Sequence, residues 1–124
     1  MEKGDAFLMG VVGGTRKHLF IVVSDPKKHQ GCGVIVNLTT DKARSGGECR
    51  LVRGEHPWLT EGESWVCYGD ATLMTPDGWA KIQVGVSKRF IVPQARLPQG
   101  CLDRIVKAAK TSKAFPSVYL KYLD

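Results

Sequence analysis

The chain has 124 residues, of which 43% are hydrophobic and 24% are charged, and it carries a formal net charge of +6. This length corresponds to one domain that can bury a core without disulfides or structural metals. The longest uninterrupted apolar run, residues 19–23, is far too short for a membrane span, so we expect no membrane partner. The N-terminus lacks an apolar signal core, and we therefore expect a cytoplasmic protein.

Three strands are predicted in the N-terminal part of the chain, at residues 5–12, 18–24 and 33–39. The second and third are rich in β-branched and aromatic residues, and each has the length of a strand buried on both faces. Gly13-Gly14 separates the first two strands. The polar, glycine-rich segment 25–33 predicts an exposed hairpin loop before the third.

The middle of the chain predicts shorter elements separated by turns. We expect a flexible loop over residues 41–47, short strands at 49–52 and 64–68, and a turn at Thr75-Pro76-Asp77-Gly78. One more strand is predicted over residues 79–86, followed by a segment at 89–92 that enters Pro93.

The pattern becomes helical after residue 97. Leu102, Ile105, Val106 and Ala109 fall at i, i+3, i+4 and i+7 with charged residues between them, which predicts an amphipathic helix with one apolar stripe. A second helical turn is expected over 118–123, after Pro116. The stripe either covers the sheet within one chain or forms a dimer interface.

The predicted fold class is mainly β with a C-terminal helix. No helix separates the early strands, which favours a small β-barrel over a parallel α/β fold. We expect the barrel to span residues 1–97 and a helical extension of the same domain to span residues 98–124.

The positive charge is concentrated in one segment. Residues 87–113 contain seven lysines and arginines and one acidic residue, Asp103, while the rest of the chain has equal numbers of each sign. A cationic face of this kind suits an acidic partner such as nucleic acid or an acidic protein segment. A solvated helix face is the alternative.

The four cysteines contain no closely spaced pair. In a reducing compartment, Cys32, Cys49, Cys67 and Cys101 are expected to be free thiols. A zinc site from Cys49, His56 and Cys67 is a weaker alternative, because structural zinc usually takes at least one close-spaced ligand pair. We therefore predict no metal and no other cofactor.

Polar side chains stand at the ends of two predicted strands. Arg16 and His18 lie at the start of the second strand, and Thr39 and Thr40 lie at the end of the third. If these strands pair antiparallel, the start of one lies beside the end of the other. A cation, an imidazole and two hydroxyls would then meet at one end of a rigid sheet, which is a plausible site for a phosphodiester.

Each of these residues has a chemical role open to it and a plainer one. Arg16 could donate to phosphoryl oxygens, His18 could act as base or acid, and Thr39 or Thr40 could hydrogen-bond to the phosphate. Asp70 could orient the base or hold the arginine. In the plainer interpretation Arg16 keeps a loop soluble, His18 satisfies a backbone carbonyl, and the threonines end a strand.

The order of the segments over residues 4–74 resembles the PemK/MazF-like toxins of bacterial toxin–antitoxin systems. The resemblance rests on Gly4-Asp5, on the stretches 18–26 and 34–40, and on the stretches 54–58 and 64–68. In that family an early Gly-Asp opens the first strand, a basic loop precedes an apolar strand ending in Ser, and the next strand ends in Thr.

The resemblance implies an SH3-like barrel, a homodimer, metal-independent cleavage of single-stranded RNA, and inhibition by an acidic antitoxin protein. By position, the strand-end threonine is Thr39. The family's Arg-Pro pair reads Lys17-His18 here, so either Arg16 or Lys17 fills the cation's role.

Further RNA contacts are expected from a set of basic, histidine and aromatic residues: Lys17, His56, Tyr68, Lys88 and Arg89. The alternative function is a non-catalytic module that binds nucleic acid or protein on the same fold, including an inactive toxin homologue.

Overall fold

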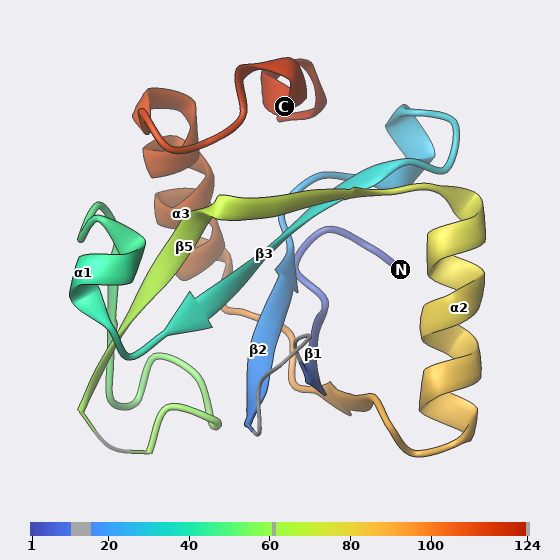
Figure 1. The fold of residues 1–124 in the computed structure, drawn as a ribbon, viewed down its shortest axis with the longest axis horizontal. Coiled ribbons are helices and arrows are strands. Elements are labelled where there is room, and N and C mark those ends of the chain that lie inside the picture. The colour runs from blue at the N-terminus through green and yellow to red at the C-terminus, as the bar shows by residue number, and fades with distance from the viewer. Residues whose placement is uncertain (11–15, 61, 124) are drawn as a thin grey trace.

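The computed structural model describes residues 1–10, 16–60 and 62–123. Within these residues, six strands form one curled, antiparallel sheet in the order β4-β5-β3-β2-β1-β6 (Figure 1). The strands are β1 Ala6–Gly10, β2 Lys17–Val22, β3 Gly33–Thr39, β4 Arg50–Val52, β5 Glu63–Met74 and β6 Val92–Gln94. The protein is therefore a small mixed domain of β-sheet and helices, as the sequence predicted in outline.

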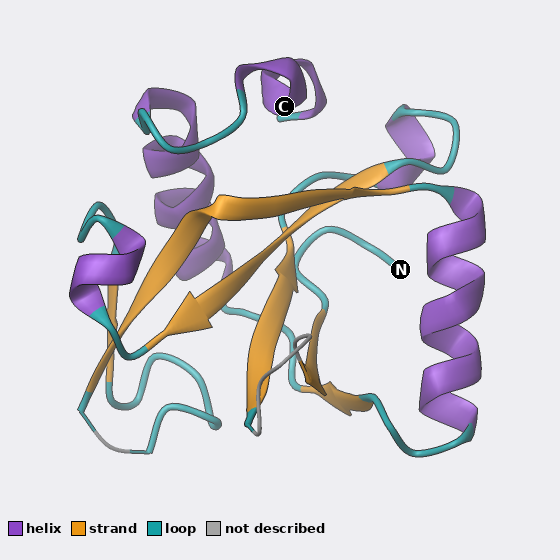
Figure 2. Ribbon diagram, in the orientation of Figure 1, coloured by secondary structure: helices purple, strands orange, loops and turns teal. Residues whose placement is uncertain are grey.

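Three α-helices and two 3₁₀ turns surround this sheet (Figure 2). They are α1 Lys42–Ser45, α2 Pro76–Ser87, α3 Gln99–Thr111, η1 Pro26–Lys28 and η2 Ser117–Tyr122. None of the helices in the described ranges has the length and apolar character needed to cross a bilayer.

Strand β3 is buried along its whole length, because helices cover both faces of the sheet. Val34, Val36 and Leu38 belong to one apolar cluster together with residues of α3. Ile35 belongs to a second cluster, which includes Ile82 of α2. A strand covered on both sides needs a continuous apolar run rather than alternation, which is the pattern read from the sequence.

The apolar stripe of α3 is used within the chain. Leu102, Ile105, Val106 and Ala109 are all buried in the cluster that the sheet contributes to. The hydroxyl of Tyr68 donates a hydrogen bond of 2.7 Å to the carbonyl of Ile105, which ties the helix to β5. Of the two roles expected for this stripe, covering the sheet and forming a dimer interface, the structure shows the first.

The strand predicted over residues 79–86 is wrong, because these residues belong to α2. The Thr75 side chain accepts a hydrogen bond from the amide of Gly78, and Pro76 occupies the first turn. A capping threonine followed by proline starts a helix as readily as it marks a turn. Trp79 and Ile82 then pack on the sheet at helical spacing.

Two predicted loops contain short helices. Segment 25–33 includes η1, capped by the side chain of Asp25, and segment 41–47 includes α1, whose first amides are capped by Asp41. The C-terminal turn predicted at 118–123 is present as η2. The first strand, predicted to reach residue 12, is described as far as Gly10, and residues 11 and 12 lie outside the described ranges.

Strand β5 carries a large irregularity opposite β3. Asn37 pairs with Cys67 and Ile35 pairs with Thr72, so residues 68–71 of β5 lie opposite Val36 alone. Extra residues of this kind bend a strand and re-aim its side chains. Here the irregularity brings Asp70 to the surface beside α1, where it meets Arg44.

Candidate functional site

Strands β2 and β3 diverge at one end of the sheet. Their ladder extends only from Val22↔Ile35 to Phe20↔Asn37, although β2 begins at Lys17 and β3 ends at Thr39. Beyond Phe20, β2 remains paired with β1. The two strand ends therefore form a fork, and the residues expected to share a site line it.

The ring of His18 bridges this fork. Its Nδ1 lies 3.1 Å from the carbonyl oxygen of Leu38. A carbonyl can only accept, so Nδ1 carries the hydrogen, and in the neutral ring Nε2 keeps its lone pair. No other residue in the described ranges hydrogen-bonds to this ring. The hydrogen bond to a backbone carbonyl, which was the plainer role expected for His18, thus fixes the tautomer in which Nε2 can act as a general base.

A hollow of about 180 Å³ opens at the fork. It is lined by Arg16, Lys17, His18, Leu38, Thr39, Thr40, Trp58 and Ser64. Four of these residues, Arg16, His18, Thr39 and Thr40, were predicted to meet from the strand-end argument alone. The volume is below the roughly 300–1,000 Å³ of typical small-molecule sites, so the hollow can enclose only a small group or part of a larger ligand.

The two threonines differ in accessibility. Thr39 is 6% exposed, and its Oγ1 accepts a hydrogen bond of 3.1 Å from the amide of Asp41. A hydroxyl that accepts still has its own hydrogen to donate. Thr40 is exposed. Thr39 is thus held in place, while Thr40 stands at the rim.

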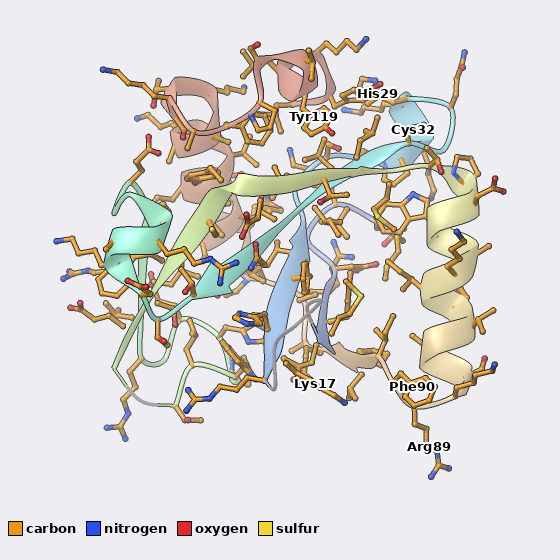
Figure 3. The ribbon with its side chains drawn as sticks, in the orientation of Figure 1. Lys17, His29, Cys32, Arg89, Phe90 and Tyr119 are labelled. Carbon is orange, nitrogen blue, oxygen red and sulfur yellow. The ribbon has the colours of Figure 1, made fainter. Side chains whose placement is uncertain are left out.

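Two cations flank the hollow. Arg16 and Lys17 are both exposed, and neither forms an ion pair with another residue of the described ranges. Figure 3 shows the Lys17 side chain at the lower end of β2, at the margin of the molecule. Unpaired cations beside a partly enclosed hollow give it a positive potential that favours an anionic group.

Asp70 does not belong to this hollow. Its Oδ2 lies 3.0 Å from Nη2 of Arg44 and accepts a hydrogen bond from the thiol of Cys67 at 3.2 Å. The prediction that Asp70 orients the base or holds Arg16 therefore needs correction, because the arginine that it binds is Arg44. Burial, the hydrogen bond to Asp70 and the charge of that carboxylate together raise the pKa of Cys67 to about 11.

His56 and Tyr68 are buried, so neither can present its ring to RNA as expected. Nε2 of His56 donates to the carbonyl of Ala95 at 2.6 Å, and its Nδ1 accepts from the amide of Trp58. Both nitrogens are therefore occupied in fixing the turn that places Trp58. Burial, followed by the nearby Cys49 thiol, raises the pKa of Tyr68.

Lys88 and Arg89 are exposed but lie at the end of α2 and do not line the hollow. Arg89 and Phe90 project at the lower end of that helix in Figure 3. Any contact that they make with a nucleic acid would therefore be outside the fork.

Trp58 and Ser64 also line the hollow, but neither was predicted from the sequence to belong to the site. The His-Pro-Trp turn was the available signal, but nothing in the sequence shows that this turn folds back over the end of β3. A second hollow, which contains Asn37 and Arg44, was also missed. The available sequence signal for this hollow was Asn37, a single polar residue within an otherwise apolar strand.

No family model matches the chain, and neither the curated proteins nor the solved structures contain a significant match. In the described ranges, no group of three or more His, Cys, Asp or Glu side chains is placed to hold a metal ion. All four cysteines are free thiols.

Proposed function

We propose that the protein is a metal-independent endoribonuclease that cleaves single-stranded RNA at the fork between β2 and β3. The observation that carries the proposal is the His18 ring, which lines a hollow flanked by two cations. Its Nδ1 bonds to the Leu38 carbonyl, and its Nε2 has no hydrogen-bond partner in the described ranges. The curled sheet and the order of the motifs are consistent with an SH3-like barrel of the PemK/MazF type.

The reaction needs no external nucleophile. Nε2 of His18 takes the proton of the ribose 2′-OH, the 2′-oxygen forms a bond to phosphorus, and the bond between phosphorus and the 5′-oxygen breaks. The leaving 5′-oxygen takes a proton from water, and His18 returns its own proton to the solvent, which gives a 2′,3′-cyclic phosphate and a 5′-hydroxyl. Arg16 or Lys17 stabilises the charge on the phosphoryl oxygens, and the Thr39 hydroxyl donates to one of them.

Two substitutions of His18 separate catalysis from structure. Asparagine places an amide N–H near the position of Nδ1, so His18→Asn keeps the bond to Leu38 and removes the base. We expect it to lower the cleavage rate by roughly 10²–10⁴-fold with little change in melting temperature. His18→Gln places its amide nearer Nε2 and should lose both activity and some stability. The measurement is cleavage of single-stranded RNA in EDTA, with end-group analysis of the products.

The cations are tested against a matched lysine elsewhere. Arg16→Ala and Lys17→Ala are each expected to lower the cleavage rate. The residue that contacts the phosphate is the one whose substitution has the larger effect, roughly 10²–10³-fold. Lys81→Ala removes the same charge from the exposed face of α2 and should leave the rate unchanged. Full activity in His18→Asn, or in the Arg16→Ala/Lys17→Ala double variant, would rule out this site.

A non-catalytic nucleic-acid-binding module is the second candidate. It is favoured by Lys107, Lys110 and Lys113, which are exposed and form no ion pair with other described residues. This candidate predicts salt-dependent RNA binding without any product. For either function, we propose that an acidic antitoxin would bind over the cationic fork, and that a homodimer would use a surface other than the buried stripe of α3.

A further inference from the structure

A second hollow, of about 320 Å³, lies on the face of the sheet to which Phe20 and Asn37 point. It is lined by Met9, Gly10, Phe20, Asn37, Arg44, Asp70 and Thr72. Its volume is at the lower end of the range typical of small-molecule sites, roughly 300–1,000 Å³. Nothing in the proposed cleavage step uses these residues.

The side chain of Asn37 is buried and unpartnered. The residue is 2% exposed, and in the described ranges its Oδ1 has no hydrogen-bond partner. Its neighbours across the sheet are Phe20 and Cys67, and the Cys67 thiol donates to Asp70 instead. Buried amides are nearly always hydrogen-bonded, so an unpartnered one at the floor of a hollow indicates a ligand that supplies the missing partner.

The other residues that line the hollow indicate the shape, polarity and charge of that ligand. Phe20 stacks on Phe7 with ring centroids 5.7 Å apart, and Met9 adds a polarizable side chain beside it, which suits a flat, largely apolar group. Arg44 is paired with Asp70, so the described residues that line the hollow include no free cation that would select an anion. The asparagine amide offers an acceptor and a donor side by side, which is how asparagine recognises the edge of a nucleobase.

The second hollow is also placed to work with the first. Side chains two residues apart on a strand share one face, so Phe20 and His18 on β2, and Asn37 and Thr39 on β3, form two successive rows. The rows are separated by roughly 7 Å along the strands, which is comparable to the spacing of neighbouring nucleotides in an extended RNA. Met9 also pairs with His18 across β1 and β2.

We propose that this second hollow binds one nucleobase of the single-stranded RNA substrate, with the amide of Asn37 hydrogen-bonded to the base edge. The inference rests on the proposed function for the identity of the ligand. It makes the hollow the element that selects the base next to the scissile phosphate.

The chain itself supplies a sharp probe, because Asn37 is its sole asparagine. Selective ¹⁵N labelling of asparagine therefore gives one side-chain NH₂ signal, to be followed by NMR during titration with millimolar adenosine, guanosine, cytidine and uridine. Nucleosides lack the phosphate, so binding at the cationic fork does not contribute. We expect one nucleoside to shift the Asn37 signal in a saturable way, while the side-chain signal of the exposed Gln99 stays unchanged in a glutamine-labelled sample.

A cleavage assay gives the second readout. Asn37→Leu keeps the size of the side chain and removes its hydrogen-bonding groups, so it should relax the base preference at the cleavage site at least tenfold and leave the melting temperature equal or higher. A threonine outside both hollows provides the control: Thr111→Val at the end of α3 should keep the preference, because the exposed Thr111 hydroxyl donates only to the carbonyl of Ala108.

The outcomes separate the two proposals. Nucleoside binding without RNA cleavage would overturn the proposed function and support the base site. Cleavage with no shift of the Asn37 signal by any nucleoside, and with unchanged base preference in Asn37→Leu, would overturn the base site, leaving a buried water as the partner of the amide.

Discussion

His56 and Asn37 are buried and His18 is half-buried, and their hydrogen-bonding groups are satisfied to different degrees. His56 uses both ring nitrogens in contacts with Ala95 and Trp58, His18 uses one, and Asn37 has no partner for its carbonyl oxygen in the described ranges. Full satisfaction is typical of a structural residue. His18 and Asn37, which keep unmet groups, each line a hollow, and this is where we propose the function.

The thiol of Cys67 gives a prediction at the level of one residue. Because its pKa is raised to about 11, thiolate is scarce at pH 8 and alkylation by iodoacetamide should be slow. The rate should keep rising as the pH approaches 11. In Asp70→Asn the carboxylate charge is gone, the pKa falls, and labelling at pH 8 should be several-fold faster. Mass spectrometry of the labelled peptides measures each site.

Cys32, which is partly exposed, serves as the internal reference for that experiment. It should be labelled well before Cys67 at pH 8. Equal labelling of the two cysteines, or no effect of Asp70→Asn, would contradict the contact between the Cys67 thiol and the Asp70 carboxylate.

At the level of elements, Glu55 joins the turn after β4 to α3. Burial alone would raise its pKa, but hydrogen bonds from the Val52 amide and Arg104, together with the charges of Arg104 and Arg50, lower it overall. The charged form of Glu55 is therefore favoured by folding. This contribution is present above the pKa of the unfolded chain and is lost as the pH falls through the lowered pKa of the folded state.

We expect Glu55→Gln to lower the free energy of unfolding by about 1 kcal/mol at pH 7, a value reduced by the partial exposure of the pair. The difference between wild type and variant should shrink as the pH is lowered from 7 to 3, because the lowered pKa means that protonation removes this contribution only in acid. Urea unfolding at the two pH values measures it. Glu63→Gln breaks the more exposed pair with Arg50 and should cost less, so an equal loss in both variants would show that Glu55 has no special role.

The elements whose burial is evident from the local pattern of apolar residues could be predicted from the sequence. The paired strands β2 and β3 and the stripe of α3 followed from apolar patterning, and their antiparallel pairing brought Arg16 and Thr39 to one hollow. Helix α2 was missed because a Thr-Pro start reads equally as a turn, and its packing on Phe20 is a contact between distant segments. The turn that brings Trp58 over the fork, and the β5 irregularity that frees Asn37, also depend on tertiary contacts.

At the level of the whole molecule, the surplus charge is divided between paired and unpaired groups. Arg96 and Arg104 are held in ion pairs with acidic residues, whereas Lys107 and Lys110 of α3 and Lys113 just after it are not, within the described ranges. An unpaired cationic face binds phosphates by releasing counterions, and its contribution is read from the dependence of affinity on salt.

We therefore expect a non-cleavable single-stranded RNA, deoxy at the scissile 2′ position, to bind more weakly as salt rises. Replacing Lys107, Lys110 and Lys113 by alanine should make the slope of log affinity against log salt shallower by roughly 2, at about 0.7 per phosphate contact. The Lys81→Ala variant should change the slope little. An unchanged slope in the triple variant would show that Lys107, Lys110 and Lys113 form a solvated surface that does not contact the RNA.

The enclosure of β3 between two layers of helices has a consequence for how fast its backbone opens. Amide protons in such a central strand exchange with solvent deuterium only through large, cooperative unfolding events, whereas those of edge strands such as β4 and β6 escape through local fraying. The amides of β3 should therefore exchange more slowly than those of β4 and β6, and the Leu38 carbonyl that accepts the His18 hydrogen bond belongs to this slowly opening strand.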